Sequence, residues 1–96
     1  MQTVEFTTVG KQVANVLKRY SIARAAIFGS FARGDENKHS DIDILIESSQ
    51  PISLFQLLRM EEELQWITKR KIDIVEYAAI KKSIRKNILK DAISIL

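Results

Sequence analysis

The sequence contains no cysteine, so neither a disulfide bond nor a metal site built from thiolates is available to it. It also lacks an apolar run long enough to cross a bilayer. Residues 1–6 carry neither the basic region nor the apolar run of a signal peptide. These absences argue against a disulfide scaffold and a membrane partner, and we expect a cytoplasmic protein.

The composition is that of an ordinary globular protein. Of the 96 residues, 46% are hydrophobic and 28% are charged, which argues against disorder. This length supports one modest hydrophobic core. We therefore predict a single domain over residues 1–96.

The net charge of +3 permits an acidic or phosphate-bearing partner without requiring one. Much of the positive charge lies in residues 81–90, which could face nucleic acid, ATP or an acidic protein. Charge runs without interleaved aromatic residues usually form a solvated helix face, and we favour that interpretation. Nucleic acid is accordingly the less favoured of these partners.

Hydrophobic periodicity predicts helices and strands that alternate along the chain. An apolar stripe at helical spacing predicts a helix over residues 7–20, and Ser30 and Gly34 have the cap preferences of a short helix. Pro51 precedes a second long helix. The predicted helices cover residues 7–20, 30–34, 53–68 and 79–95, the last burying Ile84, Ile88, Ala92 and Ile95, and the predicted strands cover 23–28, 41–47 and 71–77. This order predicts an α+β or α/β fold with helices on a small sheet, whose strand order the pattern leaves open.

Three aspartates lie on two of the predicted strands. Asp41 and Asp43 alternate with isoleucines, so both carboxylates project from one strand face while the isoleucines enter the core. Asp73 would join them if its strand were a neighbour. Carboxylates held together repel each other unless a divalent cation intervenes, and Mg²⁺ is usually held by a few such ligands, phosphate oxygens and water.

A glycine-serine turn supplies a possible phosphate site. Gly29 ends a predicted strand and lets backbone amides approach a ligand, while the helix after Ser30 offers unpaired N–H groups. Arg33 could support phosphates or form a local salt bridge, and both readings stay open. Together with the aspartates, this turn matches what nucleotidyl transfer requires.

The pattern Gly29-Ser30, ten residues, then Asp41-x-Asp43, with Arg33-Gly34 and Ser40 between, resembles the signature of the DNA polymerase β superfamily. In particular, it resembles the stand-alone minimal nucleotidyltransferases, over roughly residues 25–77. The resemblance implies an α+β polymerase β-like fold with a small mixed sheet flanked by helices. It further implies that Gly29 and Ser30 bind nucleotide phosphates, and that the three aspartates are catalytic and bind Mg²⁺, as two ions, with ATP as substrate.

The resemblance also implies a partner. Minimal nucleotidyltransferases are commonly antitoxins paired with helical HEPN toxins, and they transfer AMP from ATP to a toxin tyrosine. The alternative is a non-catalytic protein that neutralises a helical partner by occlusion, and nucleic-acid binding through the basic C-terminal segment is less favoured. We expect the acceptor site to come largely from a partner or a second copy.

The remaining distinctive side chains have simpler interpretations. His39, the only histidine, has no histidine or cysteine companion, and we interpret it as a loop residue. Phe31, Phe55 and Trp66 are interpreted as core or partner contacts, and Trp66 beside charged residues can mark an interface. Exposed apolar residues on the second and last helices are consistent with either self-association or docking of a partner.

Overall fold

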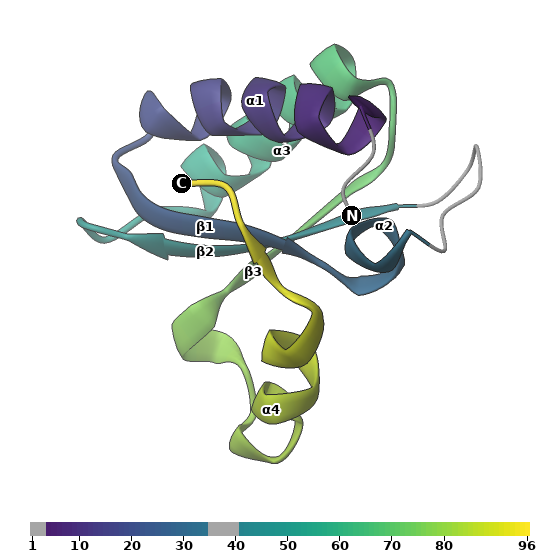
Figure 1. The fold of residues 1–96 in the computed structure, drawn as a ribbon. Helices are drawn as coiled ribbons and strands as arrows, with labels where there is room; N and C mark the ends of the chain where they lie inside the picture. Colours follow the sequence, from purple (N-terminus) through teal and green to yellow (C-terminus); the bar gives the residue numbers. More distant parts are fainter. Residues whose placement is uncertain (1–3, 35–40) are drawn as a thin grey trace.

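The computed structural model describes residues 4–34 and 41–96, which form a four-stranded sheet with helices on both faces (Figure 1). In chain order the elements are α1 (Val4–Lys18), β1 (Ile22–Phe28), α2 (Gly29–Arg33), β2 (Ile42–Ser48), α3 (Leu54–Thr68), β3 (Ile72–Glu76), the 3₁₀ helix η1 (Tyr77–Ala79), α4 (Lys82–Asp91) and β4 (Ile93–Ser94).

The strands lie in the order β3-β2-β1-β4. The β1 and β2 strands are antiparallel, whereas β2 and β3 are parallel because α3 carries the chain back across the sheet between them. The β4 strand pairs antiparallel with the other edge of β1. The sheet is therefore mixed, and the predicted α+β class is confirmed.

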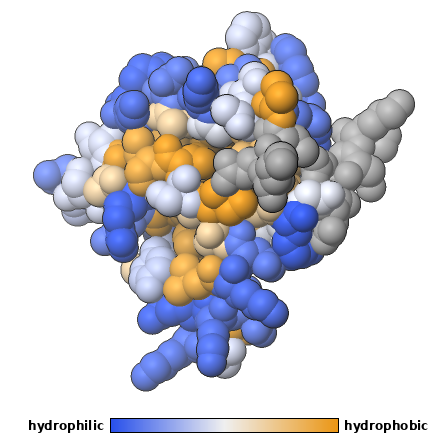
Figure 2. Space-filling view, viewed as in Figure 1, coloured by the Kyte–Doolittle hydropathy of each residue, from blue (hydrophilic) through white to orange (hydrophobic). Residues whose placement is uncertain are grey.

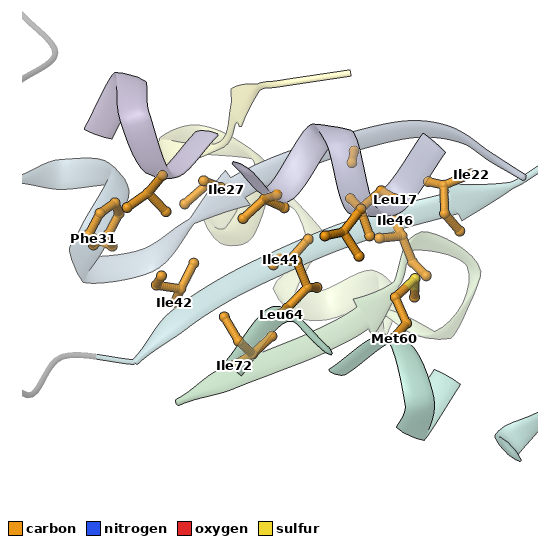
Figure 3. Packing of buried hydrophobic residues seen from close by; sticks show 14 of the residues in the cluster. Leu17, Ile22, Ile27, Phe31, Ile42, Ile44, Ile46, Met60, Leu64 and Ile72 are labelled. Carbon is orange, nitrogen blue, oxygen red and sulfur yellow. The ribbon is translucent and has the colours of Figure 1, made fainter. Parts of the chain in front are cut away.

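The core lies between the sheet and the two long helices, α1 and α3, which cover one face of it (Figures 1 and 3). The side chains of Ile42, Ile44 and Ile46 are at most 1% exposed and point to this face, as their alternation with polar residues predicts. Helix α1 contributes Val9, Val13, Val16 and Leu17 of the predicted stripe, all buried. The helix ends at Lys18, two residues before the predicted end, so Tyr20, the last residue of that stripe, lies outside it and is half-buried against the core.

Helix α3 has well-formed ends. Ser53 accepts a hydrogen bond from the Gln56 backbone N–H and the Gln56 side chain accepts one from the Ser53 backbone N–H, which is a capping box. Lys69, with φ of 59°, ends the helix in the left-handed conformation. The predicted helix over residues 53–68 is confirmed to within one residue.

The predicted last helix over residues 79–95 is wrong at both ends. Helix α4 stops at Asp91, and the chain then extends so that the Ile95 N–H donates to the Ala25 carbonyl oxygen at 3.0 Å. The open edge of β1 offers backbone groups that need partners, and this pairing overrides the helical spacing of residues 92 and 95. None of the residues of α4 is buried, and Ile84, predicted as core, is 47% exposed.

Smaller predictions also need correction. Helix α1 begins at Val4, three residues before the predicted start, and α2 begins at Gly29 with Phe28, not Ser30, at its cap position. Phe31 is in the core as expected, whereas Phe55 and Trp66 are each 73% exposed. The predicted polar turn over residues 35–38 and His39 lie outside the described residues.

The opposite face of the sheet is more open. Of the helices described in residues 4–34 and 41–96, only α4 and η1 lie against it, and Figure 2 shows mainly hydrophilic side chains over this part of the molecule. Over the two described ranges, no helix is both long enough and apolar enough to span a bilayer.

Candidate active site

The three aspartates meet on the open face of the sheet. Asp43 and Asp73 are register partners on the parallel strands β2 and β3, so their side chains leave the same face about 5 Å apart at Cα. Asp41 lies just before β2 and two residues before Asp43, which places it on that face as well. The adjacency of the two strands, on which the role of Asp73 depended, is thus present.

Gly29 lies directly against the Asp43 carboxylate. Asp43 is opposite Phe28 in the antiparallel β1–β2 pairing, and the chain turns at Gly29 with φ of 78°. A Cβ atom at this position would lie 2.3 Å from Asp43 Oδ2, which is closer than any real contact. Glycine is therefore required at position 29 for two reasons, the left-handed backbone conformation and the close approach of the Asp43 carboxylate.

Electrostatics set Asp43 apart within this group. Burial raises the pKa of the Asp43 carboxyl above its usual range, and the negative charges of Asp73 and Asp41 raise it further. Arg33 lowers it and only partly offsets these effects. The cluster is consequently short of positive charge, which a cation would supply.

The donor set fits a hard divalent ion. In residues 4–34 and 41–96 no three acidic, histidine or cysteine side chains are gathered tightly enough to form a ready-made metal cage. Mg²⁺ does not need one, because it is commonly held by one or two carboxylates together with substrate phosphates and water. The Asp43 carboxylate in the cradle made by Gly29, with Asp41 and Asp73 beside it, could hold such an ion.

The α2 turn borders the aspartates. Phe28 at its cap position makes no side-chain hydrogen bond to the first turn, and Gly34 ends the helix in the left-handed conformation with φ of 80°. Ser30, half-buried in the first turn, and the backbone N–H groups around it lie next to the Gly29–Asp43 contact. These groups could donate hydrogen bonds to a phosphate.

Arg33 belongs both to this site and to a salt bridge. Its Nη1 atom donates to Asp91 Oδ2 on α4 at 3.1 Å, and its charge acts on Asp43. The two interpretations of Arg33 that the sequence left open are therefore compatible, since the guanidinium joins α2 to α4 at the border of the site.

Helix α4 forms a wall of the site that the sequence did not predict. A hollow of about 250 Å³ lies between the α2 turn and α4, lined by Phe28, Gly29, Arg33, Ile84, Asn87, Ile88 and Asp91. A second hollow of about 260 Å³ continues along the same sheet face, where Leu45, Tyr77 and Leu89 are among its lining residues. The signal in the sequence was the low apolar content of residues 82–91, of which only Ile84, Ile88 and Leu89 are apolar.

The geometry thus brings together Asp41, Asp43, Asp73, Gly29 and Arg33, with Ser30 at the border. Such a site can hold a cation against a phosphate-bearing ligand at the open face of the sheet.

Comparison with known proteins places this geometry in a family. The model of the nucleotidyltransferase domain matches residues 10–95. A relative from Methanocaldococcus jannaschii, named "Putative protein adenylyltransferase MJ0435", is 33% identical over 88 residues, covering 92% of this chain and 95% of its own. The protein adenylyltransferase MntA of Thermococcus cleftensis is 29% identical over 76 residues, covering 79% and 77%.

Solved structures share the fold. The structure named "Structure of putative minimal nucleotidyltransferase" superposes with a TM-score of 0.82 at 26% identity, covering 97% of this chain and 95% of its own. A toxin-antitoxin structure with AMP-PNP gives a TM-score of 0.80 at 15% identity, covering 91% and 72%. The MNT antitoxin in complex with a tri-AMPylated HEPN toxin from Shewanella oneidensis gives 0.74 at 12% identity, covering 94% and 71%.

These matches confirm the resemblance first drawn from Gly29-Ser30 and Asp41-x-Asp43. The chain belongs to the nucleotidyltransferase domain family.

Proposed function

We propose that this chain is an Mg²⁺-dependent protein adenylyltransferase that moves AMP from ATP to a tyrosine hydroxyl of a HEPN toxin and acts as its antitoxin. The observation that carries the proposal is Asp43, whose carboxylate lies against Gly29 of the turn on one side and beside Asp73 of β3 on the other. This arrangement joins a phosphate-binding turn to a carboxylate cluster, the two parts that nucleotidyl transfer needs.

Each of the family's site residues has a place in the proposed reaction. Asp41, Asp43 and Asp73 would hold Mg²⁺, which when bound would neutralise charge on the reacting phosphoryl group. The backbone around Gly29 and the Ser30 hydroxyl donate to the outer phosphates, and Arg33 adds positive charge beside them. The tyrosine hydroxyl gives up its proton to water, its oxygen forms a bond to the α-phosphorus as the bond to the bridging oxygen breaks, and pyrophosphate leaves.

The known proteins support the substrate and the partner. Both relatives reported above are named as protein adenylyltransferases, and one structural neighbour contains AMP-PNP. Another neighbour is an antitoxin bound to a HEPN toxin that carries AMP groups. The open sheet face, covered in part by α4, leaves the aspartates accessible to a second protein.

Labelled ATP tests the proposal. The chain is mixed with Mg²⁺, the product of the neighbouring gene and ATP labelled at either the α- or the γ-phosphate. We expect label on the partner from α-labelled ATP alone, and its loss with EDTA. Label from the γ-position would instead indicate a kinase and contradict the proposal.

Two variants on one strand face make the test specific. Asp43→Ala should reduce labelling by about 1,000-fold, because a cation and its phosphate partner contribute several kcal/mol to the transition state. Glu47→Gln is the matched control, since Glu47 also lies on β2 but pairs with Arg24 at the far end of the strand. Full neutralisation of the toxin by Asp43→Ala, with no labelling by either protein, would favour occlusion.

A further inference from the structure

Helix α3 is apolar on two opposite faces. Its inner face carries Leu57, Met60, Leu64 and Ile67, which belong to or pack against the core. Leu54, Phe55, Leu58 and Trp66 are 70%, 73%, 54% and 73% exposed, respectively. At 3.6 residues per turn these four fall within an arc of about 120°, directly opposite the inner face. A surface helix needs only one apolar face, so the outer one requires a separate explanation.

The two ends of this outer face have different shapes. Leu54, Phe55 and Leu58 project from the N-terminal half. The C-terminal half borders an open hollow of about 660 Å³ lined by Tyr20, Arg59, Glu62, Glu63, Gln65 and Trp66. Trp66 stays largely exposed although Lys69 Nζ lies 4.6 Å from the centre of its ring. One end therefore offers apolar projections and the other a space with an aromatic wall.

We propose that two copies of this chain associate through an antiparallel pair of α3 helices related by a two-fold axis near residues 60 and 61. This axis places Phe55 of each copy at the Trp66 end of the other, so the projections enter the hollows. It also places Arg59 of each copy opposite Glu62 of the other. Both are exposed, and in the described part of the chain neither forms an ion pair, so each is available across the axis.

The charges select a second copy as the occupant. A two-fold axis requires a surface that is complementary to itself. The outer face of α3 has this property in shape, with apolar projections at one end and a hollow at the other, and in charge, with Arg59 opposite Glu62. A single helix pair is small compared with standard interfaces, so we expect a weak dimer that depends on protein concentration. The aspartates lie on the other face of the sheet, and both sites would stay accessible in the dimer.

Sedimentation equilibrium from low micromolar to near-millimolar protein tests the dimer. Trp66 is the only tryptophan, so its emission should shift to shorter wavelengths as the dimer forms. Trp66→Ala and Leu58→Ser should each raise the dissociation constant more than tenfold. The proposal is overturned if the wild-type chain stays monomeric over this range.

Charge reversal tests the antiparallel geometry. Arg59→Glu alone and Glu62→Arg alone should each be monomeric, because like charges then meet twice across the axis. Mixing the two variants should restore a dimer, since each copy now offers the opposite charge to the other. The control is Lys86→Glu on α4, the same change of sign at an exposed position outside this face, which should dimerise like the wild type.

Failure of the mixture to associate, with both variants folded by circular dichroism, would overturn the antiparallel pairing. None of these measurements uses catalysis, so the result is independent of the proposed adenylyl transfer.

Discussion

The two faces of the sheet differ in what they are built to do. One face is closed by α1 and α3 over isoleucines that are at most 1% exposed. The other carries carboxylates, two hollows and a helix without a buried residue. Because side chains alternate along β2, its isoleucines stabilise the core, while the aspartates next to them in sequence face the site.

Removing a core side chain should give the largest effect on stability. Ile44→Ala should lower the free energy of unfolding by about 2–5 kcal/mol, because Ile44 is fully buried between β2 and the helices. On the open side, Ile84→Ala should change it by less than about 0.5 kcal/mol, since Ile84 is 47% exposed. Urea unfolding measures both, and equal losses would mean that α4 covers a second core.

Gly29 tests the join between the turn and the aspartates. Gly29→Ala should cost about 1–2 kcal/mol for the left-handed backbone and should also lower transfer more than tenfold by displacing Asp43. Gly34→Ala is the matched control, because Gly34 also has φ of 80° and, its chain neighbours aside, no atom of the other described residues lies within 4 Å of the position that its Cβ would take. If both variants lost activity equally, backbone strain and not the Asp43 contact would explain the requirement.

The salt bridge between α2 and α4 should have a smaller effect. Asp91→Asn should change stability by less than about 1 kcal/mol, since the pair is partly exposed. Removal of this negative charge beside Arg33 should lower KM for ATP about two- to threefold at low salt and leave kcat unchanged. The difference should fade at high ionic strength. A higher KM would show that Asp91 positions Arg33 for binding.

The smallest effect concerns the pH dependence of stability without metal. The pKa of Asp43 is raised in the folded state, so the native chain binds this proton more tightly than the unfolded chain. Stability should therefore fall as the pH rises from the usual pKa of an aspartate through the raised one. Asp43→Asn should remove this loss of stability, because asparagine does not titrate. Thermal unfolding in EDTA should show Asp43→Asn more stable than wild type at neutral pH, with no gain below the usual pKa.

The sequence predicted the closed face well and the open face poorly. Alternation of aspartate and isoleucine over residues 41–47 determined both faces of β2, because only one register buries the isoleucines. The adjacency of β2 and β3 was left open, since strand order depends on contacts distant in sequence. The spacing of residues 84, 88, 92 and 95 suited a helix, but Ile93 and Ile95 also suit a strand. Competition for the edge of β1 decided between them, and no local pattern shows it.

The open face also explains why the site walls were missed. Asn87, Asp91 and Leu89 line hollows whose existence depends on where α4 lies over the sheet. A motif such as Gly29-Ser30 has a fixed backbone requirement and is visible in sequence, whereas a half-exposed helix has no comparable signature. The signature residues of the family were thus predictable, and their surroundings were not.

The parallel pairing of β2 with β3 has one more consequence. Asp73 lies beside Asp43 only because β3, which follows the crossover through α3, pairs with β2 in one particular register. A slip by a single residue would turn Asp73 inward and Ile72 and Ile74 toward water, which the core forbids. Burial of the isoleucines therefore determines the distance between the acidic side chains. A deletion among residues 69–71 should disturb the site although it removes none of the site residues.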